Sequence, residues 1–259
     1  MQLRKPNPLR AFLGALAVLL VVSATAQTRT QTGAEVLTLP AAPGPSNTLE
    51  AYPDLKALLM PTRNMRDRQM SAYYAVCAAV EFYLNAARLH KLNLSPDYLY
   101  LRLLRNDVPT ETILDLFQTE GTISAGLVPY GADRLPPQHV ATEHYRIRGY
   151  VALFPDTAAP LYRAERVREA LARGHPVVVT CRIRQNFLEL PERAVHYHPD
   201  AGNTQLAGTH TLLATRFYPE ERTVELMNSW GTGWGERGCL RVDYADFAEM
   251  VAGAWVVTF

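Results

Sequence analysis

The sequence predicts an α+β protein in which helices come first and strands follow. Helical periodicity recurs between residues 71 and 119, whereas β-branched runs and short alternating segments dominate from residue 145 to the C-terminus. A third observation concerns a possible site. A segment rich in glycine and tryptophan, residues 228–238, directly follows one of the predicted strands. Such a segment combines unusual backbone conformations with large apolar side chains.

The first predicted helix is buried on nearly all sides, because residues 72–80 are nine consecutive apolar residues. Ser71 stands at its start, where N-cap and first-turn residues belong. Cys77 falls in the middle of this helix. A thiol in mid-helix lacks the N-terminal dipole that lowers a cysteine pKa, so we interpret Cys77 as a small apolar core residue.

The other elements follow from the same periodicities. Further helices are expected at residues 95–105, at 110–119 with Gly121 ending the helix, and at 164–173 with Gly174 ending the helix. Strands are expected at residues 145–153, 176–183, 208–215, 224–228, 240–242 and 255–259. The strands at 208–215 and 224–228 are antiparallel if the loop between them is a hairpin.

Two polar residues stand at the ends of these last two strands. His210 lies near the start of the first, and Asn228 ends the second. An amide can hold an imidazole in a fixed orientation, and covering indoles keep water away from the hydrogen bond. We therefore expect His210 and Asn228 to pair, with Trp230 and Trp234 as the cover.

The segment Asn-Ser-Trp-Gly-Thr-Gly-Trp-Gly-Glu-Arg-Gly (228–238), preceded by a histidine at the start of a strand, resembles the papain-like (C1) cysteine peptidases. The resemblance covers roughly residues 55–259. It implies a two-lobe fold, with a helical lobe at about 71–130, a barrel-like antiparallel β lobe at about 140–259, and a cleft between them. It also implies that His210 is the general base, that Asn228 orients it, and that the family reaction is peptide-bond hydrolysis through an acyl-enzyme.

The same resemblance gives a position for the nucleophile. In the family, a catalytic cysteine begins a buried helix, a glutamate follows ten residues later, and a Ser-Pro-like helix start follows fourteen residues after that. Glu81 and Ser95 keep the second spacing, and ten residues before Glu81 stands Ser71. Gln69, a possible oxyanion donor, lies two residues before Ser71 where the family has six. The oxyanion loop is therefore three or four residues short, and the usual tryptophan after the nucleophile is Ala72.

These departures leave three functions open. The favoured one is an inactive or impaired pseudopeptidase that binds a peptide or protein in its interlobe cleft. The second is an active peptidase or acyl transferase that uses Ser71, or Cys77 in a shifted register, with His210 and Asn228. On a helix, Cys77 lies about 9 Å along the axis and about 120° around from Ser71, so His210 cannot serve both. The third is a structural protein of the cell envelope.

The N-terminus has the pattern of an export signal. Basic residues precede an apolar run at 11–22, and a small-x-small pattern ends at Ala26. We predict a secretory signal peptide at 1–26, an extended or disordered lead-in at 27–54, and a secreted or periplasmic location. An uncleaved signal would be the membrane contact. Balanced charge, 26 basic against 25 acidic residues, without a basic stripe, argues against nucleic acid as a partner.

Cysteine and histidine patterns give little support for disulfides or metals. Cys77, Cys181 and Cys239 allow at most one disulfide. His196 and His198 with Asp200 lack a third ligand at a typical spacing, so we interpret them as a surface loop. The same interpretation applies to the isolated histidines His90, His139, His144 and His175. We expect no metal and no cofactor.

Overall fold

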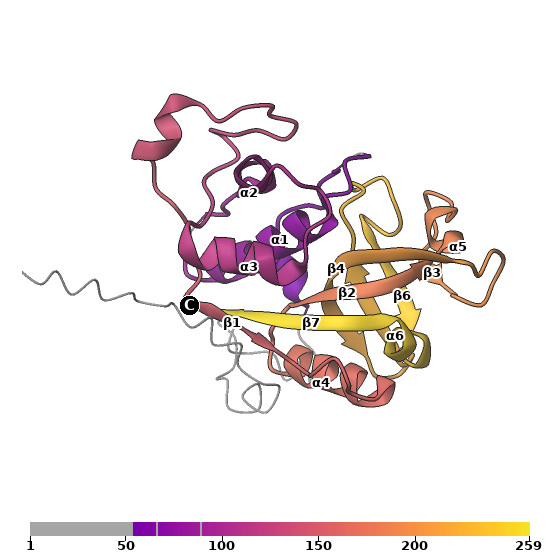
Figure 1. Cartoon of the computed structure of the whole chain (residues 1–259). Coiled ribbons are helices and arrows are strands. Elements are labelled where there is room, and N and C mark those ends of the chain that lie inside the picture. Colours follow the sequence, from indigo (N-terminus) through magenta and orange to yellow (C-terminus); the bar gives the residue numbers. More distant parts are fainter. Residues whose placement is uncertain (1–53, 66, 89) are drawn as a thin grey trace, which may run out of the picture.

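The computed structural model describes residues 54–259 except residues 66 and 89 (Figure 1). The predicted signal peptide and all but the last residue of the predicted lead-in lie outside the described residues. The helices are η2 (Leu55–Leu58), α1 (Ser71–Ala86), α2 (Pro96–Leu103), α3 (Thr110–Thr119), η3 (Pro137–Ala141), α4 (Pro160–Ala172), α5 (Gln185–Leu188) and α6 (Tyr244–Met250). The strands are β1 (Gly149–Ala152), β2 (Val177–Arg184), β3 (His196–Tyr197), β4 (Leu206–Tyr218), β5 (Thr223–Met227), β6 (Cys239–Asp243) and β7 (Val251–Thr258).

Helix α1 lies at the centre of the molecule, which explains its apolar sequence. It packs against α2 and α3 on one side and against β4 on the other, as Figure 1 shows. All of its residues from Tyr73 to Tyr83 are buried, and the core includes Tyr73, Val76 and Val80. A helix placed between two layers needs apolar side chains all round. Ser71 is its first residue.

The two helices that pack on α1 begin and end where local chemistry requires. The Tyr98 N–H donates to Ser95 Oγ at 3.0 Å, so Ser95 is the N-cap of α2, and Pro96 occupies the first position, where its missing N–H costs nothing. After α3, Gly121 adopts a φ of +77°. A Cβ at this position would lie 2.4 Å from the carbonyl oxygen of Tyr145, so only glycine fits.

The strands form one seven-stranded sheet in the order β1-β7-β2-β4-β5-β6-β3. Neighbouring strands are antiparallel, apart from the short β3, which runs parallel to β6. The long strand β4 stands between β2 and β5. Helices α4 and α6 pack on each other and on the sheet, away from α1–α3 (Figure 1). We call α1–α3 the helical lobe, and the sheet with α4–α6 the β lobe.

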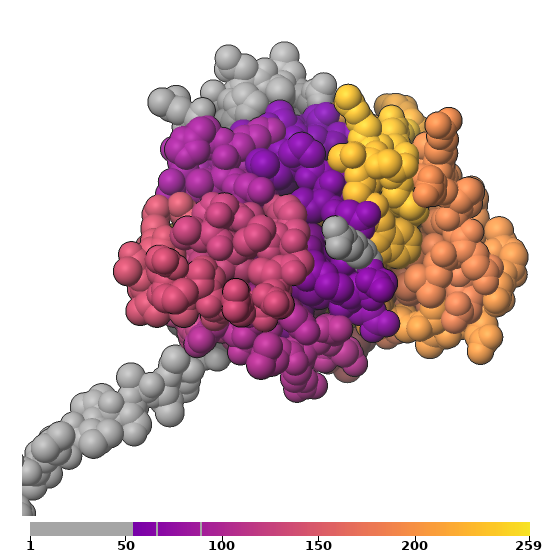
Figure 2. Space-filling view, turned by 90° about the horizontal axis from the view of Figure 1, so that it is seen from above, coloured from indigo at the N-terminus to yellow at the C-terminus, as the bar shows by residue number. Residues whose placement is uncertain are grey.

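The predicted α+β fold with a helical lobe and a β lobe is confirmed. Figure 2 shows the two lobes side by side, with the indigo and magenta segments on one side and the orange and yellow segments on the other. Among the helices of residues 54–259, none combines the length and the apolar character that a bilayer span requires.

Some local predictions were wrong. The expected strand at 145–153 shortens to β1, because Tyr145 pairs with Thr122 of the helical lobe instead, through hydrogen bonds of 2.7 and 3.0 Å. His196 belongs to strand β3 rather than to a loop. His175 is buried, not on the surface, and its Nδ1 lies 2.7 Å from the Tyr83 hydroxyl. A partner 92 positions away in the sequence leaves no local pattern.

Candidate functional site

The β4–β5 hairpin brings the predicted imidazole and amide together. Its two strands are antiparallel, with Leu213 opposite Met227 as the pair nearest to the open end. His210 and Asn228 lie just beyond that pair. His210 Nε2 is 2.8 Å from Asn228 Oδ1. The same Oδ1 accepts the Ser229 N–H at 2.7 Å, which fixes the orientation of the amide.

These contacts define the chemical state of the imidazole. Because Asn228 Oδ1 can only accept, Nε2 of His210 carries a hydrogen, which leaves Nδ1 as the basic nitrogen of the neutral ring. Burial lowers the pKa of His210 to about 4, against a smaller opposing effect of the Asn228 hydrogen bond. The ring is therefore neutral at neutral pH, and it is a weaker base than an exposed histidine.

Aromatic side chains enclose this pair. The Trp230 ring lies 5.2 Å from the His210 ring, centroid to centroid, and Trp234 packs edge-on against Trp230 at 5.0 Å. A third ring, Phe187 of α5, lies 5.6 Å from His210 and 5.3 Å from Trp230. Phe187 was not predicted as a site residue. It stands in a four-residue helix far from both motifs, so the sequence carries no signal for it.

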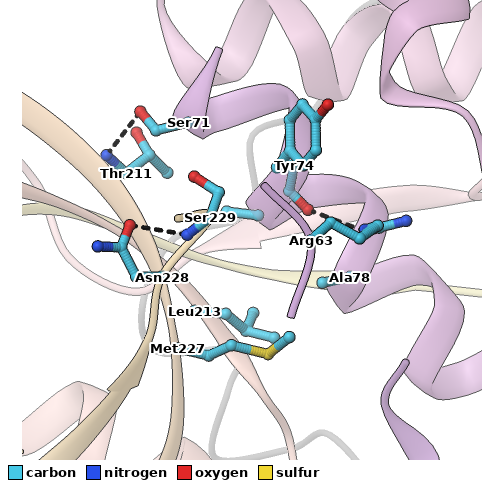
Figure 3. Close-up of a pocket in the computed structure, with 10 residues that line it drawn as sticks. Arg63, Ser71, Tyr74, Ala78, Thr211, Leu213, Met227, Asn228 and Ser229 are labelled. Carbon is cyan, nitrogen blue, oxygen red and sulfur yellow. Dashed lines mark hydrogen bonds between the residues drawn. The ribbon is translucent and has the colours of Figure 1, made fainter. Parts of the chain in front are cut away.

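Ser71 meets β4 one residue beyond the histidine. Its Oγ accepts the main-chain N–H of Thr211 at 3.1 Å (Figure 3). Thr211 is buried, and at this level of β4 the strand β5 has already ended, so the hydroxyl satisfies a donor that the sheet leaves unpaired. Within the described part of the chain, no hydrogen bond joins Ser71 to His210.

Gln69 does not line the space beside Ser71. It is exposed and has a φ of +52°, an uncommon backbone conformation for a residue other than glycine. Both of its neighbours are anchored in the protein. Met70 is fully buried, and Arg68 forms an ion pair with Asp97 and donates to the Tyr74 hydroxyl at 2.8 Å. With so short a loop, the residue between two inward anchors faces solvent.

A small cavity separates the two lobes beside Ser71. Figure 3 shows it between the start of α1, the middle of β4 and the end of β5. Its lining residues are Arg63, Ser71, Tyr74, Ala75, Ala78, Thr211, Leu213, Met227, Asn228 and Ser229. The empty space is about 270 Å³ including its mouth, but the centre of a water molecule can occupy only about 10 Å³. The cavity therefore has room for about one oxygen-sized atom.

The cysteines lie elsewhere. Cys77 is fully buried in α1 and does not line the cavity. Burial raises the pKa of its thiol well above the usual value, against a smaller lowering by Arg63. Cys181 and Cys239 are also buried, and all three thiols are free.

The histidine pair at 196 and 198 does not assemble with Asp200. Asp200 instead forms an ion pair with Arg184 at 3.0 Å. One ligand atom of His198 lies within 4.8 Å of carboxylate oxygens of Asp243, the last residue of β6, and Asp246 of α6. The sequence spacing therefore pointed to Asp200, whereas the fold brings Asp243 and Asp246 near His198.

Comparison with known protein sequences gives a match to one part of the chain. No model of a known protein family matches the chain. An uncharacterized peptidase C1-like protein of Acanthamoeba polyphaga mimivirus is 24% identical over 99 residues, 37% of this chain and 32% of that protein. The chain thus matches about a third of the length of this relative.

Solved structures cover far more of the chain. Digestive procathepsin L 3 of the Tenebrio molitor larval midgut superposes with a TM-score of 0.67 at 19% identity, over 85% of this chain and 73% of the other. Xylellain, a cysteine protease from Xylella fastidiosa, superposes with a TM-score of 0.60 at 17% identity, over 85% of this chain and 96% of the other. The Carica candamarcensis cysteine protease CMS1MS2, in complex with E-64, superposes with a TM-score of 0.61 at 18% identity, over 81% of this chain and 99% of the other. The chain therefore has the papain-like two-lobe fold.

Proposed function

We propose that this chain is an exported member of the papain-like (C1) peptidase family, and that it binds a peptide or protein segment in its interlobe cleft without efficient cleavage. One observation carries the proposal. The hydroxyl of Ser71, at the nucleophile position, is hydrogen-bonded to the Thr211 main chain and not to His210. The family resemblance of residues 228–238 and the papain-like fold support the family assignment.

The chemistry of the pair argues against turnover. A serine hydroxyl attacks a carbonyl only when a base is aligned to take its proton. His210 has a pKa lowered to about 4 by burial, so it accepts a proton poorly. A papain-like cysteine avoids this requirement because it reacts as a thiolate. Replacing sulfur by oxygen removes that advantage and leaves the weak base.

The oxyanion site is also incomplete. A side-chain donor must lie near 3 Å from the developing negative charge, and removal of one such donor costs about 10²–10³ in rate. Gln69, the expected donor, is exposed and does not line the cavity beside Ser71. The first N–H groups of α1 begin at Ser71 and are the main-chain donors that can serve this purpose.

The supporting structure around the site is nevertheless retained. The His210–Asn228 hydrogen bond, its aromatic enclosure and the cavity between the lobes are all present. Retained geometry with a weakened reaction centre favours binding over catalysis. The export signal pattern at residues 1–26 supports an extracytoplasmic location, and N-terminal sequencing of the mature protein tests it, with Gln27 as the expected first residue.

The decisive experiment compares wild-type protein with Ser71→Cys and Cys77→Ala. Each protein is assayed on a broad library of fluorogenic peptides, and on an array of unlabelled peptides for binding. We expect the wild-type protein to bind peptides and to cleave none. The variant Ser71→Cys should react with a thiol-directed epoxide, whereas Cys77→Ala should behave like the wild type.

Three results would contradict the proposal. Cleavage by the wild-type protein that Ser71→Ala abolishes would identify Ser71 as a working serine nucleophile. Cleavage that Cys77→Ala abolishes would identify Cys77 instead. Binding to no peptide at all would leave the structural role in the envelope as the better account.

A further inference from the structure

The Ser229 hydroxyl lacks a partner inside the protein. Ser229 is 5% exposed, and its Oγ is buried with no hydrogen-bond partner among the residues that the structure describes. Figure 3 shows this hydroxyl on the cavity side, facing Ser71 and Thr211. Buried polar atoms are almost always paired, so an unpaired hydroxyl that lines a cavity indicates a partner from outside the chain, either a water molecule or an oxygen of a ligand.

Other donors converge on the same place. Ser71 Oγ accepts from Thr211, so its own O–H remains free to donate, and no acceptor for it occurs in the described ranges. Helix α1 begins at Ser71 without a side-chain cap. Its first N–H groups therefore point out of the helix end, where the macrodipole favours negative charge.

The charge of the lining is compatible with an anion. The cavity is lined by one basic residue, Arg63, and by no acidic residue. Glu81 lies 2.7 Å from Arg63 and balances its charge. The attraction for an anion therefore comes from the two hydroxyls and the end of α1, and no carboxylate of the lining opposes it.

Size restricts what can enter. The space accessible to a water centre, about 10 Å³, admits one oxygen atom but no side chain. A carboxylate can place one oxygen in this space while its second oxygen remains at the end of α1. A main-chain amide presents a single, uncharged oxygen, so it gains less from the same donors.

We infer that the cleft selects peptides by their free C-terminal carboxylate, one oxygen of which is bound between Ser71 and Ser229. This inference rests on the proposed peptide-binding function, and it names the ligand class: chains that end at the site rather than chains that pass through it.

The test uses the full chain and a peptide array. Each random hexapeptide is attached through its N-terminus and is present twice, once with a free carboxyl end and once as the carboxamide. We expect about tenfold stronger binding to the free acids, because hydrogen bonds to a charged group contribute more than hydrogen bonds to a neutral one. Equal binding to acids and amides would overturn this inference while leaving peptide binding intact. Binding to neither form would overturn the proposed function as well.

Two variants separate the cavity from other carboxylate contacts. Ser229→Ala should bring the acid-to-amide ratio close to one, whereas Thr157→Ala, which removes an exposed hydroxyl, should leave the ratio unchanged. Thermal unfolding confirms that both variants are folded. An unchanged ratio in Ser229→Ala would overturn the inference. So would amides ending in Asp or Glu that bind as well as the free acids, because a side-chain carboxylate would then be the ligand.

Discussion

Ser71 Oγ accepts the Thr211 main-chain N–H at 3.1 Å, so the first residue of α1 is tied to the residue that follows His210. The bond joins the helical lobe to the β lobe next to the His210–Asn228 pair. The Ser71 hydroxyl therefore has a structural partner, and we expect its removal to lower the free energy of unfolding.

We expect Ser71→Ala to lower the free energy of unfolding by about 1–3 kcal/mol, because the buried Thr211 N–H loses its acceptor. Urea unfolding measures this change. Thr157→Ala, at an exposed position, should stay within about 0.5 kcal/mol of the wild type. Equal stabilities of Ser71→Ala and wild type would mean that the hydrogen bond contributes nothing.

The buried imidazole predicts a pH dependence. The pKa of His210 is about 4 in the folded protein, whereas an unfolded histidine titrates near 6.5. Between these values the unfolded chain binds a proton that the folded protein does not. Stability should therefore fall as the pH drops from about 6.5 to 4, by about 3 kcal/mol from this residue.

Urea unfolding at several pH values tests this dependence. The difference between wild type and His210→Gln isolates the imidazole from the acidic groups that also titrate in the range. In His210→Gln the loss between pH 6.5 and 4 should be smaller, whereas His90→Gln, at an exposed position, should match the wild type. Parallel pH profiles for His210→Gln and wild type would show that this histidine is not buried as a neutral ring.

Phe187 should control the basicity of the site. Its ring lies 5.6 Å from the His210 ring, so Phe187→Leu opens space and lets water approach the imidazole. We expect the pKa of His210 to rise toward the usual value, as followed by NMR titration of the imidazole. Phe217→Leu, a comparable loss beside Tyr244, is the control and should not change that titration. An unchanged His210 pKa in Phe187→Leu would mean that residues other than Phe187 lower the pKa of the imidazole.

The buried ion pair of the helical lobe should matter far more than a surface pair. Arg63 Nη1 lies 2.7 Å from Glu81, whose side chain is completely buried and also accepts the Leu94 N–H. Glu81→Gln should cost about 3–5 kcal/mol, because it leaves the buried guanidinium without its counter-charge. Glu120→Gln breaks the half-exposed pair with Arg102 and should cost less than about 1 kcal/mol. Chemical unfolding measures both variants, and similar losses of stability in Glu81→Gln and Glu120→Gln would contradict this ranking.

Cys77 should not react in the folded protein. Burial raises the pKa of its thiol, and no solvent reaches it. Iodoacetamide followed by peptide mass mapping should label Cys77 only after denaturation. Rapid labelling of the native protein at Cys77 would place this sulfur in the cleft and would revive its assignment as the nucleophile.

The fold class could be predicted because its signals are local. Nine apolar residues in a row specify a helix with no solvent face, and β-branched runs specify buried strands. The hairpin that joins His210 to Asn228 also follows from neighbouring segments. By contrast, β3 and α6 were missed, since a two-residue strand and a seven-residue helix depend on contacts that short patterns do not encode.

The sequence by itself determined which residues stand at the site: an imidazole and an amide at adjoining strand ends, and a hydroxyl at the start of a buried helix. Periodicity is enough to locate the strand ends and the helix start, and the resemblance to papain-like peptidases implied that the three groups share one site. Only the tertiary structure decided what each group does there. The partner of Ser71 lies 140 positions away, and Phe187 and Ser229 acquire their surroundings when the two lobes meet. Hydrogen bonds and burial across such distances depend on packing, which no local pattern records.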